Sequence, residues 1–421
     1  MTQPATTPSP GAKRSLYTLF LANVISWTGN QFAFLAIPWF VLATTGSAAQ
    51  TGITAFFTLV PLVIGTFFGG TLVDRTGFKA ASVIADIASG VTVLFIPLLF
   101  GLDLLPFWLL QVLVFLGTLL DAPGATARNA LLPDLAEAAA MPLEQVTSLN
   151  QITERGSRLL GFPLAGFLIA FLDAPNVLYL NAISFFISAL LVWLVVPANK
   201  TTPEEGTTQT ATSYMEDLRA GLGYLRQDAL LLTIVAIVLV SNFLDAALSS
   251  VIYPVYVSEV YGSAIGLGLL FGMSGGGAAV GALLYGTYGP SLPRRKVYLG
   301  AWLGIALARM VLIFLPPLWL LLVASALVGI SAGPLNPIMH TVAYERIPPA
   351  MRGRTLGIIG SGALLATPLS VLLAGYALEW LGLLPTVTIV LVGYLLTAVS
   401  LFFNRQLHEM DADRLDVDKA V

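Results

Sequence analysis

Four ionisable side chains stand inside long apolar stretches of this sequence, where each could do chemistry that its neighbours could not. They are Asp86, Asp121, Asp245 and Arg309. A charge at the centre of a bilayer costs about 3 kcal/mol on insertion scales, so such groups are usually paired or used in function. We therefore treat all four as candidate functional residues.

Asp245, in the run SNFLDAALSS, is the deepest of these acids and the first candidate for coupling to protons. An apolar cavity favours the neutral form of a carboxyl group, so this side chain could bind a proton on one side of a membrane and release it on the other. A structural hydrogen bond to Asn242 or to a neighbouring helix is the equally supported alternative.

Asp121 is the second candidate for the proton. It stands two residues before Pro123 and could pair with Arg128 instead. We expect Arg309 to be a buried partner for an acid rather than a ligand for substrate. Asp86 is expected to belong to a charge cluster at the cytoplasmic face.

The first apolar stretch also carries polar and aromatic side chains that could face a substrate. Trp27, Asn30, Gln31 and Phe34, together with Asn242 in a later stretch, are the candidates for lining a cavity. Asn30 and Gln31 fall near the middle of the bilayer, where transporters built from repeats place their binding sites. The aromatic rings could form a wall for flat apolar substrates, and they could equally face lipid.

These side chains must be positioned by membrane-crossing helices. Hydrophobic residues make up 57% of the 421 residues and charged residues only 10%, with a mean hydropathy of +0.85. A soluble domain has roughly 25% charged residues. Apolar runs of about 20 residues, the length that crosses a bilayer core, recur along the chain. They predict twelve helices over 16–43, 50–73, 80–101, 106–127, 147–171, 176–197, 229–257, 265–288, 296–315, 318–340, 354–378 and 384–404.

The charges between these runs predict the orientation of the chain. Lys and Arg gather in alternate loops, whereas the opposite loops contain no Lys or Arg and only the acids Asp103, Asp173, Glu259 and Glu379. Because positively charged loops stay in the cytoplasm, both termini are expected there. Two termini on one side require an even number of helices, which agrees with twelve.

The longest polar stretch divides the predicted helices into two sets of six. Residues 198–228 begin as a flexible linker and continue as an amphipathic helix, with Leu218, Leu222 and Leu225 on its apolar face, expected to lie on the cytoplasmic surface of the membrane. The expected organisation is a tail over 1–15, bundles over 16–197 and 229–404 flanking this linker, and a tail over 405–421. Two related six-helix bundles form a common architecture of secondary transporters.

The turn between the second and third predicted helices carries the most specific motif. Its sequence from Gly70 to Lys79, GTLVDRTGFK, resembles the G-x-x-x-D-R-x-G-R-K signature of the major facilitator superfamily. Gly77 permits the chain to reverse, and Asp74 can face a helix N-terminus or an arginine. The resemblance implies two six-helix bundles around a central cavity that opens alternately to the two sides.

The same resemblance implies that this turn is a conformational gate. Its gate residues would be Gly70, Asp74, Arg75, Gly77 and Lys79, with Arg128 or Arg352 as the partner of the aspartate in the other elements. The alternative is a solvated loop acid that only sets the topology.

Further strings resemble one branch of that superfamily. PWFVL at 38–42 followed by Thr45-Gly46-Ser47, and the Arg352-Gly353-Arg354 start of a late helix, are similar to the macrolide-efflux and enterobactin-exporter group. That resemblance implies proton-driven export of small, largely apolar compounds, such as drugs or siderophore-like metabolites, across the plasma or inner membrane. A nutrient or lipid carrier of the same fold, or a membrane receptor or scaffold that transports nothing, is the alternative.

Several other functions are disfavoured by residues that the sequence lacks. There is no cysteine, no G-x-x-x-x-G-K-[ST] nucleotide-binding string and no large basic patch, and the two histidines, His340 and His408, are far apart. We therefore expect no enzyme activity, no metal or cofactor and no nucleic-acid partner. The expected partners are a small hydrophobic substrate, protons and the lipid bilayer, and we expect a monomer.

Overall fold

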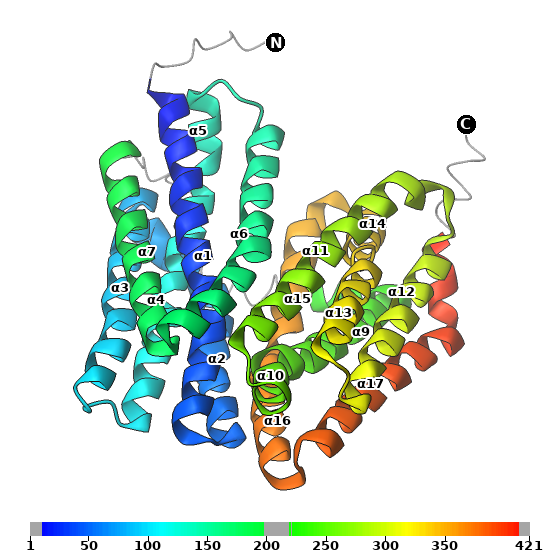
Figure 1. Ribbon diagram of the computed structural model, residues 1–421. Helices are drawn as coiled ribbons and strands as arrows, with labels where there is room; N and C mark the ends of the chain where they lie inside the picture. Colours follow the sequence, from blue (N-terminus) through cyan, green and yellow to red (C-terminus); the bar gives the residue numbers. More distant parts are fainter. Residues whose placement is uncertain (1–10, 198–218, 220, 412–421) are drawn as a thin grey trace, which may run out of the picture. The chain divides into compact units, whose positions relative to one another are not determined.

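The computed structural model describes residues 11–197, 219 and 221–411, apart from the side chains of 66–76, 290, 350, 353–354 and 361. Within this part the chain is helical throughout and contains no strand (Figure 1). It divides into two compact units. One consists of Met1–Glu204 with Ser263–Gly268, and the other of Glu205–Gly262 with Leu269–Val421.

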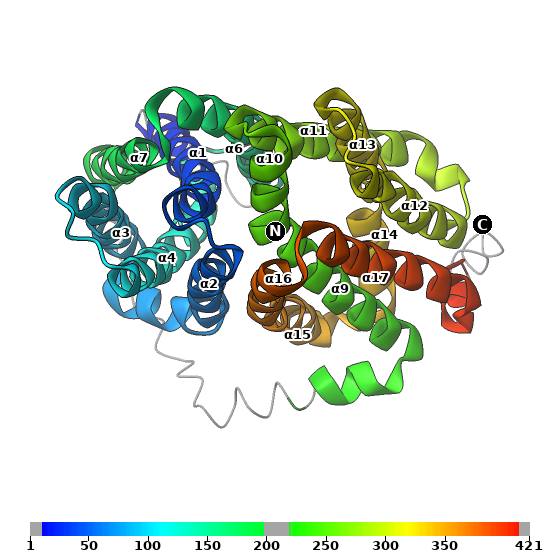
Figure 2. The same cartoon turned by 60° about the horizontal axis from the view of Figure 1, so that its bottom comes forward.

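The first unit is built on long helices joined by short turns. Its elements are α1 (Ala12–Thr45), α2 (Ala48–Thr76), α3 (Phe78–Gly101), α4 (Phe107–Ala130), α5 (Leu132–Ala138), α6 (Leu143–Leu172) and α7 (Ala174–Val195). Within this unit α1 packs along α7 and α6, and α3 lies between α4 and α7 (Figure 2). Near the start of α1, Leu16 and Leu19 pack with Leu135 of α5, Val146 of α6 and Val192 of α7 in one buried cluster.

The second unit is built on helices that are more often interrupted, and it includes all of the helix Ala264–Tyr288 except its first residues, 264–268, which belong to the first unit. Its elements are α9 (Ala229–Ala247), η1 (Leu248–Ile252), α10 (Tyr253–Tyr261), α11 (Ala264–Tyr288), η2 (Gly289–Ser291), α12 (Arg294–Arg309), η3 (Met310–Phe314), α13 (Leu318–Ala332), α14 (Leu335–Arg346), η4 (Pro349–Met351), α15 (Arg352–Leu365), α16 (Thr367–Leu381), α17 (Leu383–Phe403) and η5 (Arg405–Asp411). Proline explains three of the interruptions, because Pro254, Pro334 and Pro368 each follow a break and cannot donate a backbone hydrogen bond.

The helices confirm the expected all-α membrane fold. Eleven helical segments within the described residues are long and apolar enough to cross a membrane. The first helix, α1, has 34 residues but is not among them, because Asn23, Asn30 and Gln31 lower its hydropathy. The predicted ranges lie close to the observed ones. The range 80–101, for example, corresponds to Phe78–Gly101 of α3.

Two short helical segments differ from the sequence-based expectation. The seven-residue α5 was not predicted, because it is too short and too mixed in composition to be recognised. Residues 221–227 are helical as expected. However, Leu225 is buried in a cluster with Leu231, Ala343 and Ile347, so it packs on protein rather than on lipid. The earlier part of that predicted helix lies outside the described residues.

Candidate functional site

Asp121 of α4 faces Asn30 of α1 inside the first unit. The Asn30 side-chain amide donates a hydrogen bond of 2.9 Å to Oδ2 of Asp121. The other carboxyl oxygen, Oδ1, is buried and has no hydrogen-bond partner among the described residues. An ionised carboxylate normally accepts several hydrogen bonds, so the charged form of Asp121 has fewer hydrogen-bond donors around it than it needs.

A fully buried ion pair joins α3 and α4 in the same unit. Nη1 of Arg128 lies 2.6 Å from Oδ1 of Asp86, and the two side chains are 1% and 0% exposed. Ser188 of α7 donates to the second oxygen of Asp86 at 2.6 Å. Gly124 allows the close approach, because a Cβ there would lie 3.0 Å from the Cβ of Ala85.

The sequence predicted Asp86 in a charge cluster at the cytoplasmic face, and the structure pairs it with Arg128, one of the charges assigned to that face, with no exposure of its side chain at all. Arg128 is committed to Asp86 rather than to Asp121. It was also expected as a partner for Asp74, whose side chain lies outside the described residues, so that contact stays a prediction.

The other cavity candidates of α1 lie on one stripe of the helix, at spacings of three and four residues. All are half-buried. Gln31 donates to the backbone carbonyl of Trp27 at 3.0 Å, and its Cβ would lie 3.0 Å from a Cβ at Gly161 of α6. Phe34 meets Phe162 of α6 edge to face, with ring centroids 5.6 Å apart. This stripe therefore packs against α6, whereas Asn30 on the same helix bonds to Asp121 of α4.

The turn between α2 and α3 has the backbone that its glycine predicts. Gly77 has φ = 82° and ψ = 143°, a conformation that side chains strongly disfavour. Phe78 packs against the buried Ala81 and Ala127, and Lys79 is half-buried. Of the remaining gate candidates, Gly70 lies within α2, and the side chains of Asp74 and Arg75 lie outside the described residues.

Arg352, the other expected partner of the gate, has a local structural role. Its Nε donates to the carbonyl of Ile347 at 3.1 Å, and its Nη2 donates to that of Tyr344 at 2.9 Å. These carbonyls belong to the end of α14, where backbone acceptors have no partner within the helix. Arg352 therefore caps α14. Whether it also meets Asp74 stays a prediction.

Asp245 of α9 is the centre of a polar cluster in the second unit. Its Oδ1 lies 2.7 Å from Nη2 of Arg309 in α12 and accepts a hydrogen bond of 2.6 Å from the hydroxyl of Tyr394 in α17. The guanidinium of Arg309 also lies over the Tyr394 ring, 4.1 Å from its centroid. Asp245 is 49% exposed and Arg309 only 10%. The cluster therefore links three helices, α9, α12 and α17.

Asn242 does not bond to Asp245, but the other form of the structural alternative is confirmed, because Asp245 bonds to the neighbouring helices α12 and α17. Its amide donates instead to the carbonyl of Ala363 in α15 at 3.1 Å. Asn242 therefore links α9 to α15, and Asp245 is left to Arg309 and Tyr394.

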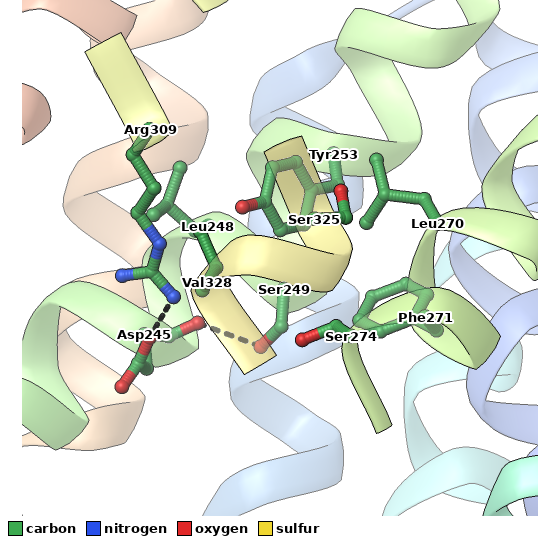
Figure 3. A pocket seen from close by; sticks show the side chains of 10 residues that line it. All are labelled: Asp245, Leu248, Ser249, Tyr253, Leu270, Phe271, Ser274, Arg309, Ser325 and Val328. Atoms are coloured by element: carbon green, nitrogen blue, oxygen red, sulfur yellow. Dashed lines mark hydrogen bonds and ion pairs between the residues drawn. The ribbon is translucent and has the colours of Figure 1, made fainter. Parts of the chain in front are cut away.

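A cavity of about 240 Å³ opens beside the Asp245–Arg309 pair. Figure 3 shows Arg309 reaching down to Asp245, with Ser249, Tyr253 and Phe271 around the adjoining space. All the residues that line it belong to the second unit: Asp245, Leu248, Ser249, Tyr253, Leu270, Phe271, Ser274, Arg309, Ser325 and Val328.

A π-helical turn, η1, shapes one side of this cavity. The backbone N–H of Tyr253 donates to the carbonyl of Leu248, five residues earlier. In an α-helix, side chains four residues apart drift around the axis by about 40°. The wider π turn offsets that drift, so Asp245, Ser249 and Tyr253 all line the cavity. Pro254 explains the turn, since its ring would clash with the carbonyl four residues before it in a regular helix.

Sequence reasoning missed two residues that complete these clusters, Ser188 and Tyr394. Each lies far along the chain from its carboxylate partner, 102 and 149 residues away respectively. A serine or tyrosine in an apolar helix gives no local signal that it faces a charge. The described residues contain no group of three or more His, Asp or Glu side chains that could hold a metal ion.

Comparisons with known proteins agree on one family. The sequence model of the Major Facilitator Superfamily matches residues 19–243 and 235–415. The chain is 32% identical to the multidrug efflux pump Tap of Mycolicibacterium fortuitum over 400 residues, which are 94% of this chain and 97% of that protein. It is 22% identical to macrolide efflux protein A of Streptococcus pyogenes, over 88% of this chain and 91% of that protein.

The fold is similar to that of a solved transporter. The crystal structure of the nucleoside transporter NupG superimposes with a TM-score of 0.76 at 11% identity, over 92% of this chain and 98% of that one. At that identity the likeness concerns the fold alone.

Proposed function

The chain belongs to the Major Facilitator Superfamily, and we propose that it exports small, largely apolar compounds in exchange for protons. Export is supported by the relatives that cover nearly the whole chain, whose names describe a multidrug efflux pump and a macrolide efflux protein. In this proposal the protein lies in the plasma or inner membrane as a monomer, moves its cargo by alternating access and keeps both termini in the cytoplasm. The clean separation of Lys and Arg between alternate loops supports that orientation.

The observation that carries proton coupling is the environment of Asp121. One carboxyl oxygen accepts from Asn30, and the other is buried with no partner among the described residues. A proton on that second oxygen would remove the uncompensated charge and leave the bond to Asn30 intact. A proton exchanger needs a carboxyl group that is protonated in one conformation of the protein and ionised in another.

Asp245, the first candidate from the sequence, has a different role in this proposal. The charge of Arg309 already neutralises its carboxylate, and the Tyr394 hydroxyl donates to the same oxygen. This contact gives the side chain a structural role, because losing either partner would leave the mostly buried arginine without a counter-ion. Asp245 therefore holds α9, α12 and α17 together, and its half-exposed side chain borders the cavity.

The turn from Gly70 to Lys79 is the proposed gate on the cytoplasmic side. Its support is the positive φ of Gly77, which fixes a sharp reversal between α2 and α3, and the similarity of the sequence motif to that of the superfamily. A rigid turn can transmit the movement of one helix to the next.

Transport by the purified protein in liposomes tests the proton-coupling proposal. Asp121→Asn keeps an oxygen that can accept the bond from Asn30 but cannot gain or lose a proton. We expect it to lose accumulation of ethidium driven by a pH gradient and to keep exchange of ethidium across the membrane without a gradient. The matched control is Asp103→Asn, an exposed acid at φ = 55°, a conformation that asparagine also adopts readily.

Gradient-driven accumulation by Asp121→Asn at the rate of the wild type would refute Asp121 as the proton site. Loss of both gradient-driven transport and exchange would indicate a role in binding cargo rather than protons. Transport of the compounds only in the opposite direction, or of none of them, would favour a nutrient or lipid carrier instead.

A further inference from the structure

The cavity beside the π turn has the size and the lining of a ligand site. Its volume of about 240 Å³ exceeds the roughly 150 Å³ of an apolar protein cavity that binds benzene. Leu270, Phe271 and Val328 contribute apolar side chains to the lining, and Arg309 and Tyr253 contribute polar atoms. There is room for an aromatic ring with a small substituent.

Arg309 is the polar group of this cavity with unused capacity. Its side chain is nine-tenths buried, and Nη2 donates to Asp245. Neither Nε nor Nη1 has a hydrogen-bond partner of good geometry among the described residues, and the Tyr253 hydroxyl is the one cavity group near enough to interact with the free side of the guanidinium. A guanidinium has five N–H donors, and leaving buried donors unpaired costs about 1–3 kcal/mol. An acceptor atom brought by a ligand would offset that cost.

The other polar side chains of the lining add to this preference for an acceptor or are already engaged. The hydroxyl groups of Ser249 and Ser325 already donate to backbone carbonyls four residues earlier, those of Asp245 and Leu321. The carboxylate of Asp245 is neutralised by Arg309. A cationic ligand would therefore meet an already compensated acid and the guanidinium itself, which repels it.

We infer that this cavity binds a ring-sized apolar group that carries a carbonyl or carboxylate oxygen, with Arg309 as the donor to that oxygen. This assigns a ligand site that lies wholly within the second unit. It deepens the proposed function by naming the chemistry of the compounds received there, and it rests on that function only in taking such compounds to be cargo.

Binding of three small probes to the purified full chain in lipid nanodiscs tests the inference. Benzamide and benzoate carry the acceptor oxygen on a benzene ring, whereas benzylammonium has a similar size and the opposite chemistry. Ligand-detected NMR titrations without any proton gradient give the affinities. We expect benzamide and benzoate to bind about tenfold or more tightly than benzylammonium, a difference of about 1.4 kcal/mol.

Variants that fill the cavity locate the binding. Val328→Phe places a ring in the cavity, and Ser274→Leu fills it from another helix, α11. The control Val323→Phe adds the same ring to the exposed face of α13. We expect both filling variants to weaken benzamide binding about tenfold or more and the control to leave it unchanged.

Two results would overturn the inference. Equal binding of benzylammonium would show that the ligand chemistry is wrong, and unchanged binding in whichever filling variant remains folded would show that the site is elsewhere. Neither result bears on proton coupling at Asp121, because binding is measured without a gradient. Conversely, loss of proton coupling would leave these affinities as they are.

Discussion

Replacing Asp86 by asparagine should destabilise the first unit strongly, although the side chain keeps its shape. The change leaves Arg128, which is 1% exposed, with a positive charge and no counter-ion. Breaking a buried ion pair from one side costs about 3–5 kcal/mol. The asparagine amide can keep its oxygen toward Arg128 and turn its nitrogen toward Ser188, whose hydroxyl can rotate to accept, so the lost charge is the main cost. We therefore expect a loss within that range.

The pair formed by Glu154 and Arg158 is the matched control in the same unit. Its atoms lie 2.8 Å apart, nearly as close as those of the buried pair, but both side chains are exposed on α6. Exposed pairs at this helical spacing contribute about 0.3–0.5 kcal/mol. Glu154→Gln should consequently change the free energy of unfolding by roughly a tenth of the change caused by Asp86→Asn.

Equilibrium unfolding of the purified protein in mixed detergent micelles measures both changes. The double variant Asp86→Leu with Arg128→Met removes both charges together, and we expect it to be more stable than Asp86→Asn alone. A cost below about 1 kcal/mol for Asp86→Asn, or a double variant less stable than the single one, would refute the reasoning from burial.

Two further predictions concern the turn and the second cluster. Gly77 has φ = 82°, so Gly77→Ala should lower the free energy of unfolding by about 1–3 kcal/mol and slow transport. The control is Gly300→Ala, whose added Cβ meets no atom within 4 Å and which should do neither. Equal effects of the two variants in thermal unfolding and in liposome transport would contradict the backbone strain assigned to Gly77. Tyr394→Phe keeps the ring beneath Arg309 but removes the hydroxyl that donates to Asp245, so its cost should be about 1 kcal/mol, lowered by the exposure of that acid. A change of several kcal/mol in unfolding would show that the hydroxyl matters more than its single bond explains.

Sequence reasoning recovered the helices because their signal is local. A run of apolar residues long enough to cross a membrane is visible without knowing any neighbour. The apolar run over 80–101 therefore predicts α3 to within two residues of its start. The glycine at position 77 likewise predicts a positive φ in this turn, since few other residue types adopt that conformation. The interruptions of the second unit were not predicted, because the expected helices over 229–257, 318–340 and 354–378 each run through a break that the structure places next to a proline.

The partners of the buried charges could not be predicted in the same way. Asp86 and Asp121 are both possible partners of Arg128 by sequence, and nothing local says which of them takes it. That choice depends on how closely α3 approaches α4 at Gly124, which is a property of packing. The prediction of Leu225 on a membrane surface was wrong for a related reason, because an apolar helix face looks the same whether protein or lipid covers it.

The release of protons on adding substrate tests the central claim, proton coupling through Asp121, most directly. The purified protein is placed in weakly buffered detergent solution with a pH indicator, and a macrolide, ethidium and a catecholate siderophore are added in turn. We predict that at least one compound releases protons from the wild type and from Asp245→Asn, and that Asp121→Asn releases none while still binding the compound. Proton release by Asp121→Asn equal to that of the wild type, or release by neither protein with any compound that binds, would contradict the claim.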